Sequence, residues 1–138
     1  MAKHVIYDAV VNINAVALTD RARSVTYTVG TNAQPSAAMS EVQDYDMPGT
    51  LFISPIVVEY YQDYAASNVY ITHRTIWDAR SSVVLTVKAS SAADSATNPN
   101  FTITVFVAQM DYINGARGDV HVNTVTYEPA GAISYDVT

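Results

Sequence analysis

Histidines and carboxylates are the residues here whose chemistry could serve catalysis or metal binding. The three histidines are His4, His73 and His121, and none stands at the short spacing that lets one strand or helix present two imidazoles to a metal ion. Packing or surface roles are therefore the stronger interpretation for all three. The chain has no cysteine, which excludes disulfides, thiolate nucleophiles and sulfur metal ligands.

A short acidic run contains Glu41, Asp44 and Asp46. Carboxylate oxygens suit hard cations such as calcium, but the twelve-residue calcium loop with its central glycine does not occur in this sequence. A solvated acidic loop is the better interpretation of the three residues.

Two short motifs have a biological meaning in other contexts. Arg117-Gly118-Asp119 spells the adhesion tripeptide of integrin ligands, but three-residue matches arise by chance, and Gly and Asp are common in turns. Asn100-Phe101-Thr102 fits the glycan acceptor pattern, which matters only on a secretory route. The sequence contains no Gly-x-Ser-x-Gly, phosphate-binding loop or dinucleotide fingerprint. We therefore expect a protein that is not an enzyme and that uses no cofactor and no metal.

The composition indicates a protein that does not work as a free monomer. The length of 138 residues fits one domain spanning residues 1–138. Charged residues make up 14% of the chain, well below the roughly 25% of a typical soluble domain. A free monomer needs a polar exterior, so this deficit indicates that part of the surface is covered, most simply by copies of the same chain. The net charge of −6 argues against binding nucleic acid through its phosphates, which requires a cationic face.

Nothing in the sequence indicates export or insertion into a membrane. The apolar run Val5-Ile6-Tyr7 is too short for a signal peptide. No apolar stretch approaches the length of a membrane-spanning helix. We expect a soluble protein that is made in a cytoplasm.

Val, Ile, Thr and Tyr recur in short runs broken by Asn, Gly, Pro and Ala-Ser clusters, a pattern typical of antiparallel strands. We expect strands at residues 4–13, 21–29, 50–61, 82–89, 101–110 and 120–127. The last two form the clearest hairpin, with turn residues at Asn114-Gly115 and Gly118-Asp119. The predicted fold class is mainly β: an antiparallel β-sandwich or barrel with one short α-helix, a long inter-strand loop and extended terminal arms.

The short helix is predicted just after the strand at residues 50–61. Asp63 stands where an N-cap is favoured, and residues 64–77 place a stripe of side chains on one helical face. The residues expected to pack this helix on the sheet are Tyr64, Val69 and Ile76. β-Branched residues are frequent after Val69, so packing rather than intrinsic propensity must hold the helix.

Residues 30–49 are predicted to form the long loop. The segment has no sustained period, and Pro35 and Pro48 discourage regular strand pairing. A structureless connection of this length is uncommon in a compact domain and is usually functional. It carries a set of side chains that suit contacts between subunits: Gln34, Met39, Val42, Tyr45 and Met47.

Four segments stand in a distinctive order and spacing along the chain. They are Val11-Asn12-Ile13-Asn14-Ala15-Val16-Ala17-Leu18-Thr19-Asp20 with Arg23-Ser24-Val25; Val58-Glu59-Tyr60-Tyr61-Gln62-Asp63-Tyr64-Ala65-Ala66 with Val69; Ser95-Ala96-Thr97-Asn98-Pro99; and Gly118-Asp119 leading into Thr124-Val125-Thr126. Together they resemble the tail tube (major tail) proteins of long-tailed bacteriophages that infect actinobacteria, over most of the chain.

The resemblance implies a structural virion protein that polymerises into hexameric rings, which stack as the tail tube. The sheets of the subunits would join into one barrel around a channel, and the loop and the terminal arms would bridge subunits or rings. Phage DNA would pass through the lumen without specific binding during genome ejection. Glu41, Asp44 and Asp46 are then candidates for the lumen wall, because negative charge repels phosphates.

The expected partners are copies of this chain and other phage tail proteins, including the tape measure, with no membrane involved. The expected location is the virion tail, after assembly in the host cytoplasm. Another virion β-sandwich protein, such as a capsid decoration protein or a tail adaptor, would share the low charge without forming tubes. A carbohydrate-binding module is a further alternative, since ten tyrosines and Trp77 could stack on sugars.

Overall fold

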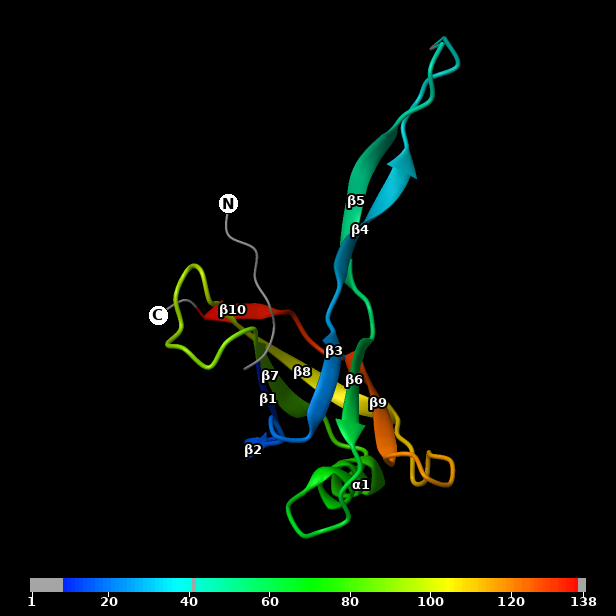
Figure 1. The fold of residues 1–138 in the computed structure, drawn as a ribbon. Helices are drawn as coiled ribbons and strands as arrows, with labels where there is room; N and C mark the ends of the chain where they lie inside the picture. Colours follow the sequence, from blue (N-terminus) through cyan, green and yellow to red (C-terminus); the bar gives the residue numbers. More distant parts are fainter. Residues whose placement is uncertain (1–8, 41, 137–138) are drawn as a thin grey trace.

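The computed structural model describes residues 9–40 and 42–136 (Figure 1). Their strands are β1 (Val10–Ile13), β2 (Val16–Ala17), β3 (Ala22–Thr26), β4 (Val29–Pro35), β5 (Asp46–Ile53), β6 (Ile56–Tyr61), β7 (Val83–Lys88), β8 (Asn100–Gln109), β9 (Val122–Pro129) and β10 (Ser134–Asp136), and the helix is α1 (Val69–Ala79). All pairings between these strands are antiparallel. The predicted fold, mainly β and antiparallel with one short helix, is confirmed.

Eight strands form one curved sheet, in the order β2-β1-β7-β8-β9-β6-β3, with β10 also paired to β8. The long strand β8 serves both halves of the sheet, because its first part pairs with β7 and its last part with β9. A register shift between Val107 and Gln109 disturbs the second pairing, as a β-bulge does where a strand bends. The two end strands, β2 and β3, do not pair with each other. The sheet is therefore sandwich-like, and it is not a closed barrel.

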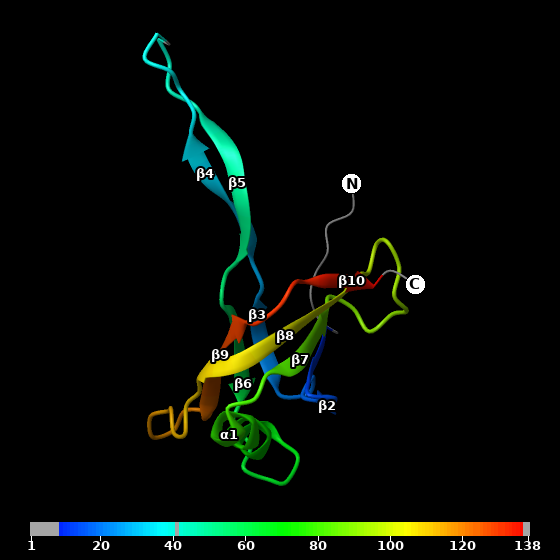
Figure 2. The ribbon, with the colours of Figure 1, turned by 180° about the vertical axis from the view of Figure 1, so that it is seen from behind.

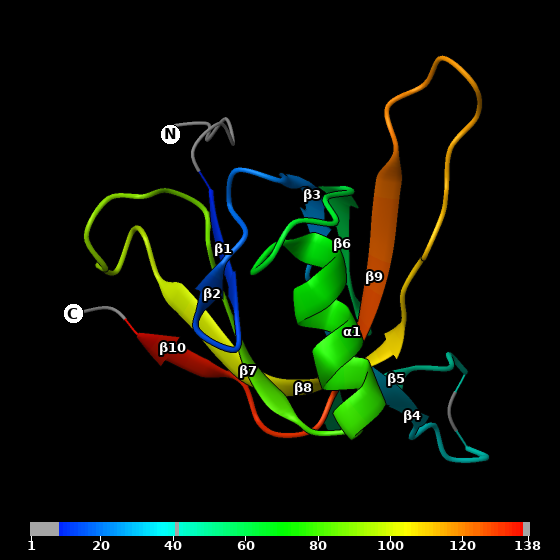
Figure 3. The same cartoon turned by 90° about the horizontal axis from the view of Figure 1, so that it is seen from below.

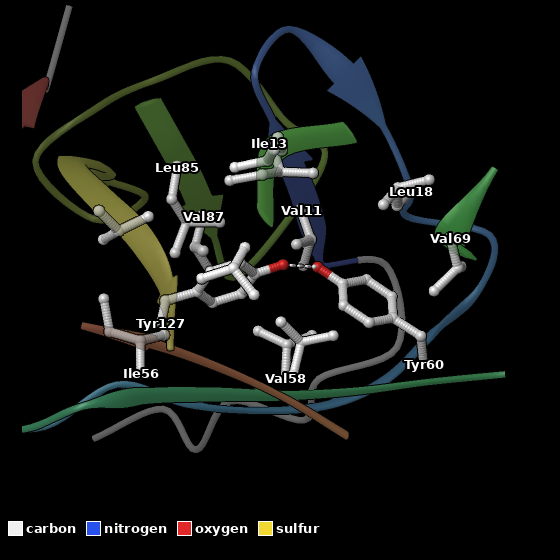
Figure 4. Close-up of a cluster of buried hydrophobic side chains, with 14 of the residues drawn as sticks. Val11, Ile13, Leu18, Ile56, Val58, Tyr60, Val69, Leu85, Val87 and Tyr127 are labelled. Atoms are coloured by element: carbon white, nitrogen blue, oxygen red, sulfur yellow. Dashed lines mark hydrogen bonds between the residues drawn. The ribbon is translucent and has the colours of Figure 1, made fainter. Parts of the chain in front are cut away.

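The core lies on the concave side of the curved sheet. Side chains along the central strands alternate between this side, where they are buried, and the opposite side, where they are more exposed. Burial alternates along β6, where Ile56, Val58 and Tyr60 point inward, and along β9 up to Tyr127. Figure 4 shows side chains of β1 and β6 facing each other across this core. Fully burying one Val, Leu or Ile side chain stabilises a fold by about 1.5–3 kcal/mol. The buried apolar residues are Val11, Ile13, Leu18, Ile56, Val58, Tyr60, Val69, Ile76, Leu85, Val87, Ile103, Val105, Val107, Val125 and Tyr127.

Helix α1 lies across the lower side of the curved sheet (Figure 3). Its buried residues are Val69, Thr72, His73 and Ile76, the i, i+3, i+4, i+7 spacing of a single helical stripe. The helix ends at Arg80, whose left-handed backbone (φ 52°) terminates the hydrogen-bond ladder. Packing of this stripe compensates for the low helix propensity of the segment.

The helix begins five residues later than predicted. Its N-cap position is occupied by Asn68, and the prediction that Asp63 fills that position is wrong. The Asp63 carboxylate instead accepts hydrogen bonds from the Ala65 N–H at 2.9 Å and from Arg21 Nε at 3.0 Å. Asp63 therefore fixes a turn ahead of the helix, and Tyr64 lies in that turn rather than on α1.

The prediction of a loop at residues 30–49 is wrong at both ends of the segment, and only the described residues between Pro35 and Asp46 lack a strand. Strands β4 and β5 pair there as a two-stranded hairpin, which projects from the sheet as an arm (Figures 1 and 2); we call residues 29–53 the arm. Each strand of such a ribbon has only one neighbour, so a proline can sit where no hydrogen bond is required. Pro35 lies at the end of β4, and Pro48 lies beside the register shift between Thr31 and Ala33.

The remaining strand predictions differ mainly where the chain enters and leaves the arm. The strand predicted at 50–61 is divided at Ser54 and Pro55 into β5 and β6, and the strand predicted at 21–29 is shared between β3 and β4. Strands β7, β8 and β9 begin and end within two residues of their predictions. β1 coincides with the end of the strand predicted at 4–13; residues 4–8 and most of the N-terminal arm lie outside the described residues. The described end of the C-terminal arm is β10, paired with β8.

Candidate assembly surfaces

The core contains one buried chain of polar side chains, which links α1 to the sheet. His73 Nδ1 lies 2.7 Å from the Val69 carbonyl oxygen, and His73 Nε2 contacts the Tyr127 hydroxyl. The Tyr127 hydroxyl lies 2.9 Å from the Tyr60 hydroxyl. A carbonyl oxygen only accepts, so Nδ1 carries the proton and Nε2 accepts from Tyr127. Tyr60 then donates to Tyr127, which gives one consistent direction of donation along the chain.

This hydrogen-bonded set of three side chains has a structural role, because burial keeps all three neutral. Burial lowers the pKa of His73 to about 4, and the hydrogen bond to Val69 opposes this only in part. Burial also raises the pKa of Tyr60 and that of Tyr127. The three side chains are completely inaccessible to solvent, so no substrate reaches them. Their hydrogen bonds hold α1 against β6 and β9.

The other residues singled out for their chemistry do not form a metal site in the described part of the chain. No group of three His, Asp or Glu side chains there could hold a metal ion, and His4 lies outside it. His121 Nε2 accepts a hydrogen bond from the Asn114 N–H at 2.7 Å, which fixes the loop between β8 and β9. Arg117-Gly118-Asp119 lies on the exposed part of this loop, and Asn100-Phe101-Thr102 lies within β8.

Large apolar side chains that stay exposed gather at two opposite ends of the molecule. Among the described residues there are sixteen of them, of which seven lie on the arm and six on α1, in the turn before it or in the loop between β8 and β9. The arm set is Val29, Met39, Val42, Tyr45, Met47, Leu51 and Phe52, and the second set is Tyr64, Ile71, Trp77, Tyr112, Ile113 and Val120. Figures 1 and 2 show the arm and α1 at opposite ends. Exposed apolar patches of this kind mark interaction sites.

The arm contains the side chains that the sequence indicated as contacts between subunits. Met39 and Val42 are fully exposed (106% and 104%), and Tyr45 and Met47 are about half exposed. Gln34 lies on β4 in register with Met47 on β5. The structure thus brings this set together on one projecting element.

The arm is also acidic. Asp44 and Asp46 are exposed in its second half, and Glu41 lies outside the described residues. Residues 29–53 contain no Lys and no Arg. The arm therefore presents negative charge beside apolar side chains.

The opposite end of the molecule has a cluster of rings, which we call the basal aromatic surface: Tyr64, Tyr70, Trp77 and Tyr112. Tyr70 lies 5.1 Å from Tyr64 and 5.5 Å from Tyr112, and Tyr112 lies 6.4 Å from Trp77, measured between ring centroids. The Tyr64 hydroxyl donates to the Tyr112 carbonyl oxygen at 2.6 Å. Three separate segments supply these rings, so no local sequence pattern reveals the cluster.

A cleft of about 490 Å³ opens where β3 approaches β1 and β7. Its apolar lining includes Val11, Val25, Tyr27, Val87, Phe101 and Ile133. Arg23 and Lys88 also line it and already form ion pairs with Glu59 at 2.9 Å and Asp94 at 3.1 Å. Among the described strands only β6 pairs with β3, so the outer edge of β3 can accept another strand.

The fold is similar to that of a chain in the cryo-EM structure of the anti-feeding prophage (AFP) baseplate, 6-fold symmetrised. The match covers 98% of this chain and 97% of that chain, with a TM-score of 0.57 and 12% sequence identity. The likeness is one of fold. Coverage of this extent includes nearly all of the arm as well as the sheet. No protein-family model matches the sequence, and no curated protein matches it. No helix in the described residues is long and apolar enough to cross a membrane.

Proposed function

We propose that this protein is a structural subunit of a phage-tail-type assembly, in which copies form six-membered rings that stack into a tail tube. The observation that carries this proposal is the arm, where Met39 and Val42 are fully exposed to water. A two-stranded hairpin is marginally stable alone in water. A neighbouring subunit that covers these side chains would stabilise both the arm and the assembly, by about 1.5–3 kcal/mol for each side chain fully buried.

Ring formation is supported by the edges of the sheet. The outer edge of β3 pairs with no other strand of the described residues, and an unprotected edge favours uncontrolled association. Joining this edge to a neighbouring copy would satisfy its backbone groups, and a closed ring fixes the number of copies. We infer six copies in each ring from the resemblance in sequence and from the 6-fold symmetry of the assembly that contains the similar fold.

The role in the virion tail follows from the same proposal. The net charge of −6 suits a tube that DNA traverses without adhering, because negative charge repels the phosphate backbone. A lumen position for Glu41, Asp44 and Asp46 stays a prediction. Other tail proteins, including the tape measure, would be partners, with assembly in the host cytoplasm and no enzymatic step.

Electron microscopy of the purified full-length protein tests the proposal. We expect hollow filaments or stacked rings whose length grows with protein concentration. The double variant Met39→Ser/Val42→Ser should keep its circular dichroism spectrum and lose the filaments. Ala93→Ser/Ala96→Ser, in the exposed loop between β7 and β8, is the matched control and should assemble normally. A monomer at every concentration would refute the proposal.

A single ring in a baseplate is a second candidate, favoured by the origin of the similar fold in a baseplate structure. Such a protein would form rings that do not stack. The same micrographs separate the two, because discrete rings at high concentration favour the baseplate role and filaments favour the tube.

A further inference from the structure

We propose that the tip of the arm of one copy docks on the basal aromatic surface of the next copy, as the axial contact of the assembly. This inference rests on the proposed function, which it deepens by naming the two surfaces that meet. It follows from position: the arm and α1 lie at opposite ends of the molecule (Figures 1 and 2). Copies stacked in one orientation bring an arm tip to the α1 end of the following copy.

The basal aromatic surface has the composition of a binding hot spot. Trp, Tyr and Arg dominate such sites because they bury large areas and keep a polar group for orientation. Arg74 lies over the ring of Tyr70, with 6.0 Å between its guanidinium carbon and the ring centroid. The ring contacts and the hydrogen bond from Tyr64 to Tyr112 hold the surface in place before a partner arrives. Preorganisation of this kind reduces the entropy cost of binding.

A hollow beside these rings provides space for side chains of the tip. It has a volume of about 360 Å³ and is lined by Ile76, Trp77, Asp78, Arg80, Ser82 and Phe106 among others. Apolar side chains of the arm tip, Met39 and Val42, are fully exposed. Methionine is flexible and fills irregular apolar spaces well.

Charge complements shape at the two ends. The arm has acidic residues and no Lys or Arg. The hollow is lined by Arg80, which forms no ion pair within the described residues, and by Asp78, whose carboxylate already pairs with Arg74 at 3.4 Å. An arm tip with Asp44 and Asp46 would meet the unpaired guanidinium group of Arg80 there. Pairing of two tips would oppose like charges, so charge favours a head-to-tail contact.

A head-to-tail contact is heterologous, with a different surface on each partner. When the rotation between neighbouring copies does not close into a ring, a heterologous contact repeats from copy to copy and generates a filament. The proposed pairing therefore explains stacking, while the edge of β3 remains available for ring closure.

Cysteine cross-linking tests the pairing directly, because the natural chain has no cysteine. In the full-length protein we place one cysteine on the tip (Val42→Cys) and one in the hollow (Ser82→Cys). Mild oxidation of assembled protein should give a ladder of covalent dimers, trimers and longer species. The control pair Val42→Cys with Ala96→Cys, in the loop between β7 and β8, should give none. Filaments that form without the Val42–Ser82 ladder overturn this docking and leave the proposed function intact, whereas the absence of any assembly overturns both.

Trp77 gives a second readout, because it is the only tryptophan of the chain and is 47% exposed. Assembly should shift its emission to shorter wavelength and reduce quenching by acrylamide. Arg80→Glu should raise the concentration needed for assembly by roughly threefold to fivefold, the effect of losing one exposed ion pair. Adding Asp44→Lys to that variant should restore assembly. Unchanged tryptophan emission in filaments, or no rescue by the second change, would contradict the docking.

Discussion

Acid should weaken this protein well before its carboxylates are protonated, because His73 is buried as a neutral group. Burial lowers its pKa from 6.5 to about 4. As the pH falls below 6.5, the unfolded chain binds a proton at this residue while the folded chain does not. The free energy of unfolding then decreases until the pH reaches about 4, where the folded state also binds the proton.

The size of this loss follows from the same interval. At 1.36 kcal/mol per pKa unit, lowering the pH from 7 to 4 costs about 3 kcal/mol of stability. The side chain is completely buried, so solvent screening does not reduce the effect. Protonation also breaks the donation pattern, because Nε2–H would donate to Tyr127 and leave the Tyr60 hydroxyl to reorient. A loss of this size is a large part of the 5–15 kcal/mol that is typical of native proteins.

Urea denaturation at pH 7, 6, 5 and 4 measures this slope. The Met39→Ser/Val42→Ser variant is the background, so that assembly does not contribute to the measured stability. His73→Gln keeps a polar neutral side chain at the position and removes the titration. It should be less stable at pH 7 and should lose about 3 kcal/mol less than the parent between pH 7 and 4. Equal slopes for parent and variant would refute the reasoning.

Three further predictions address the core, the arm and the channel. Tyr127→Phe removes the hydroxyl that accepts from Tyr60 and donates to His73, and should cost about 1–3 kcal/mol in urea denaturation, whereas the same change at an exposed tyrosine should cost little. Gly49→Ala places a Cβ 2.7 Å from a backbone carbonyl oxygen across the hairpin, so filament formation should fall while the thermal midpoint of the sheet is unchanged. Glu41→Lys should slow genome ejection from assembled virions if residue 41 faces the channel, and ejection at the normal rate would exclude a lumen position for it.

The central strands were predictable because their two faces differ. Along β7, Leu85 and Val87 are buried while Val84 is exposed, and that difference appears in the sequence as alternation of residue types. The same holds for β8 and β9, and these three strands were placed within two residues. Burial on one face is what makes a strand visible in a sequence.

The arm was not recognised as a hairpin for the converse reason. Along β4 every residue except Gly30 is exposed, so packing imposes no alternation of residue types. The prolines of the segment, Pro35 and Pro48, indicated a break in strand pairing. The helix start was missed because Asp63 has the chemistry of an N-cap but uses its carboxylate on a turn. The basal aromatic surface depends on tertiary contacts between three segments. Sequence therefore predicted the half-buried elements, and the elements completed by contacts across the chain or by a partner required the structure.

The low charge of the chain can now be assigned to particular surfaces. A deficit of charged residues has two physical explanations, a large core or an exterior that a partner covers. The core accounts for the inward face of the sheet, yet thirteen of the sixteen exposed large apolar side chains in the described residues lie on the arm or around α1. A chain selected for lateral contacts alone would place them along its sheet edges. Their position at the two ends instead supports the proposed axial contacts, which would bury this apolar area, and the proposed pairing at β3 would close each ring.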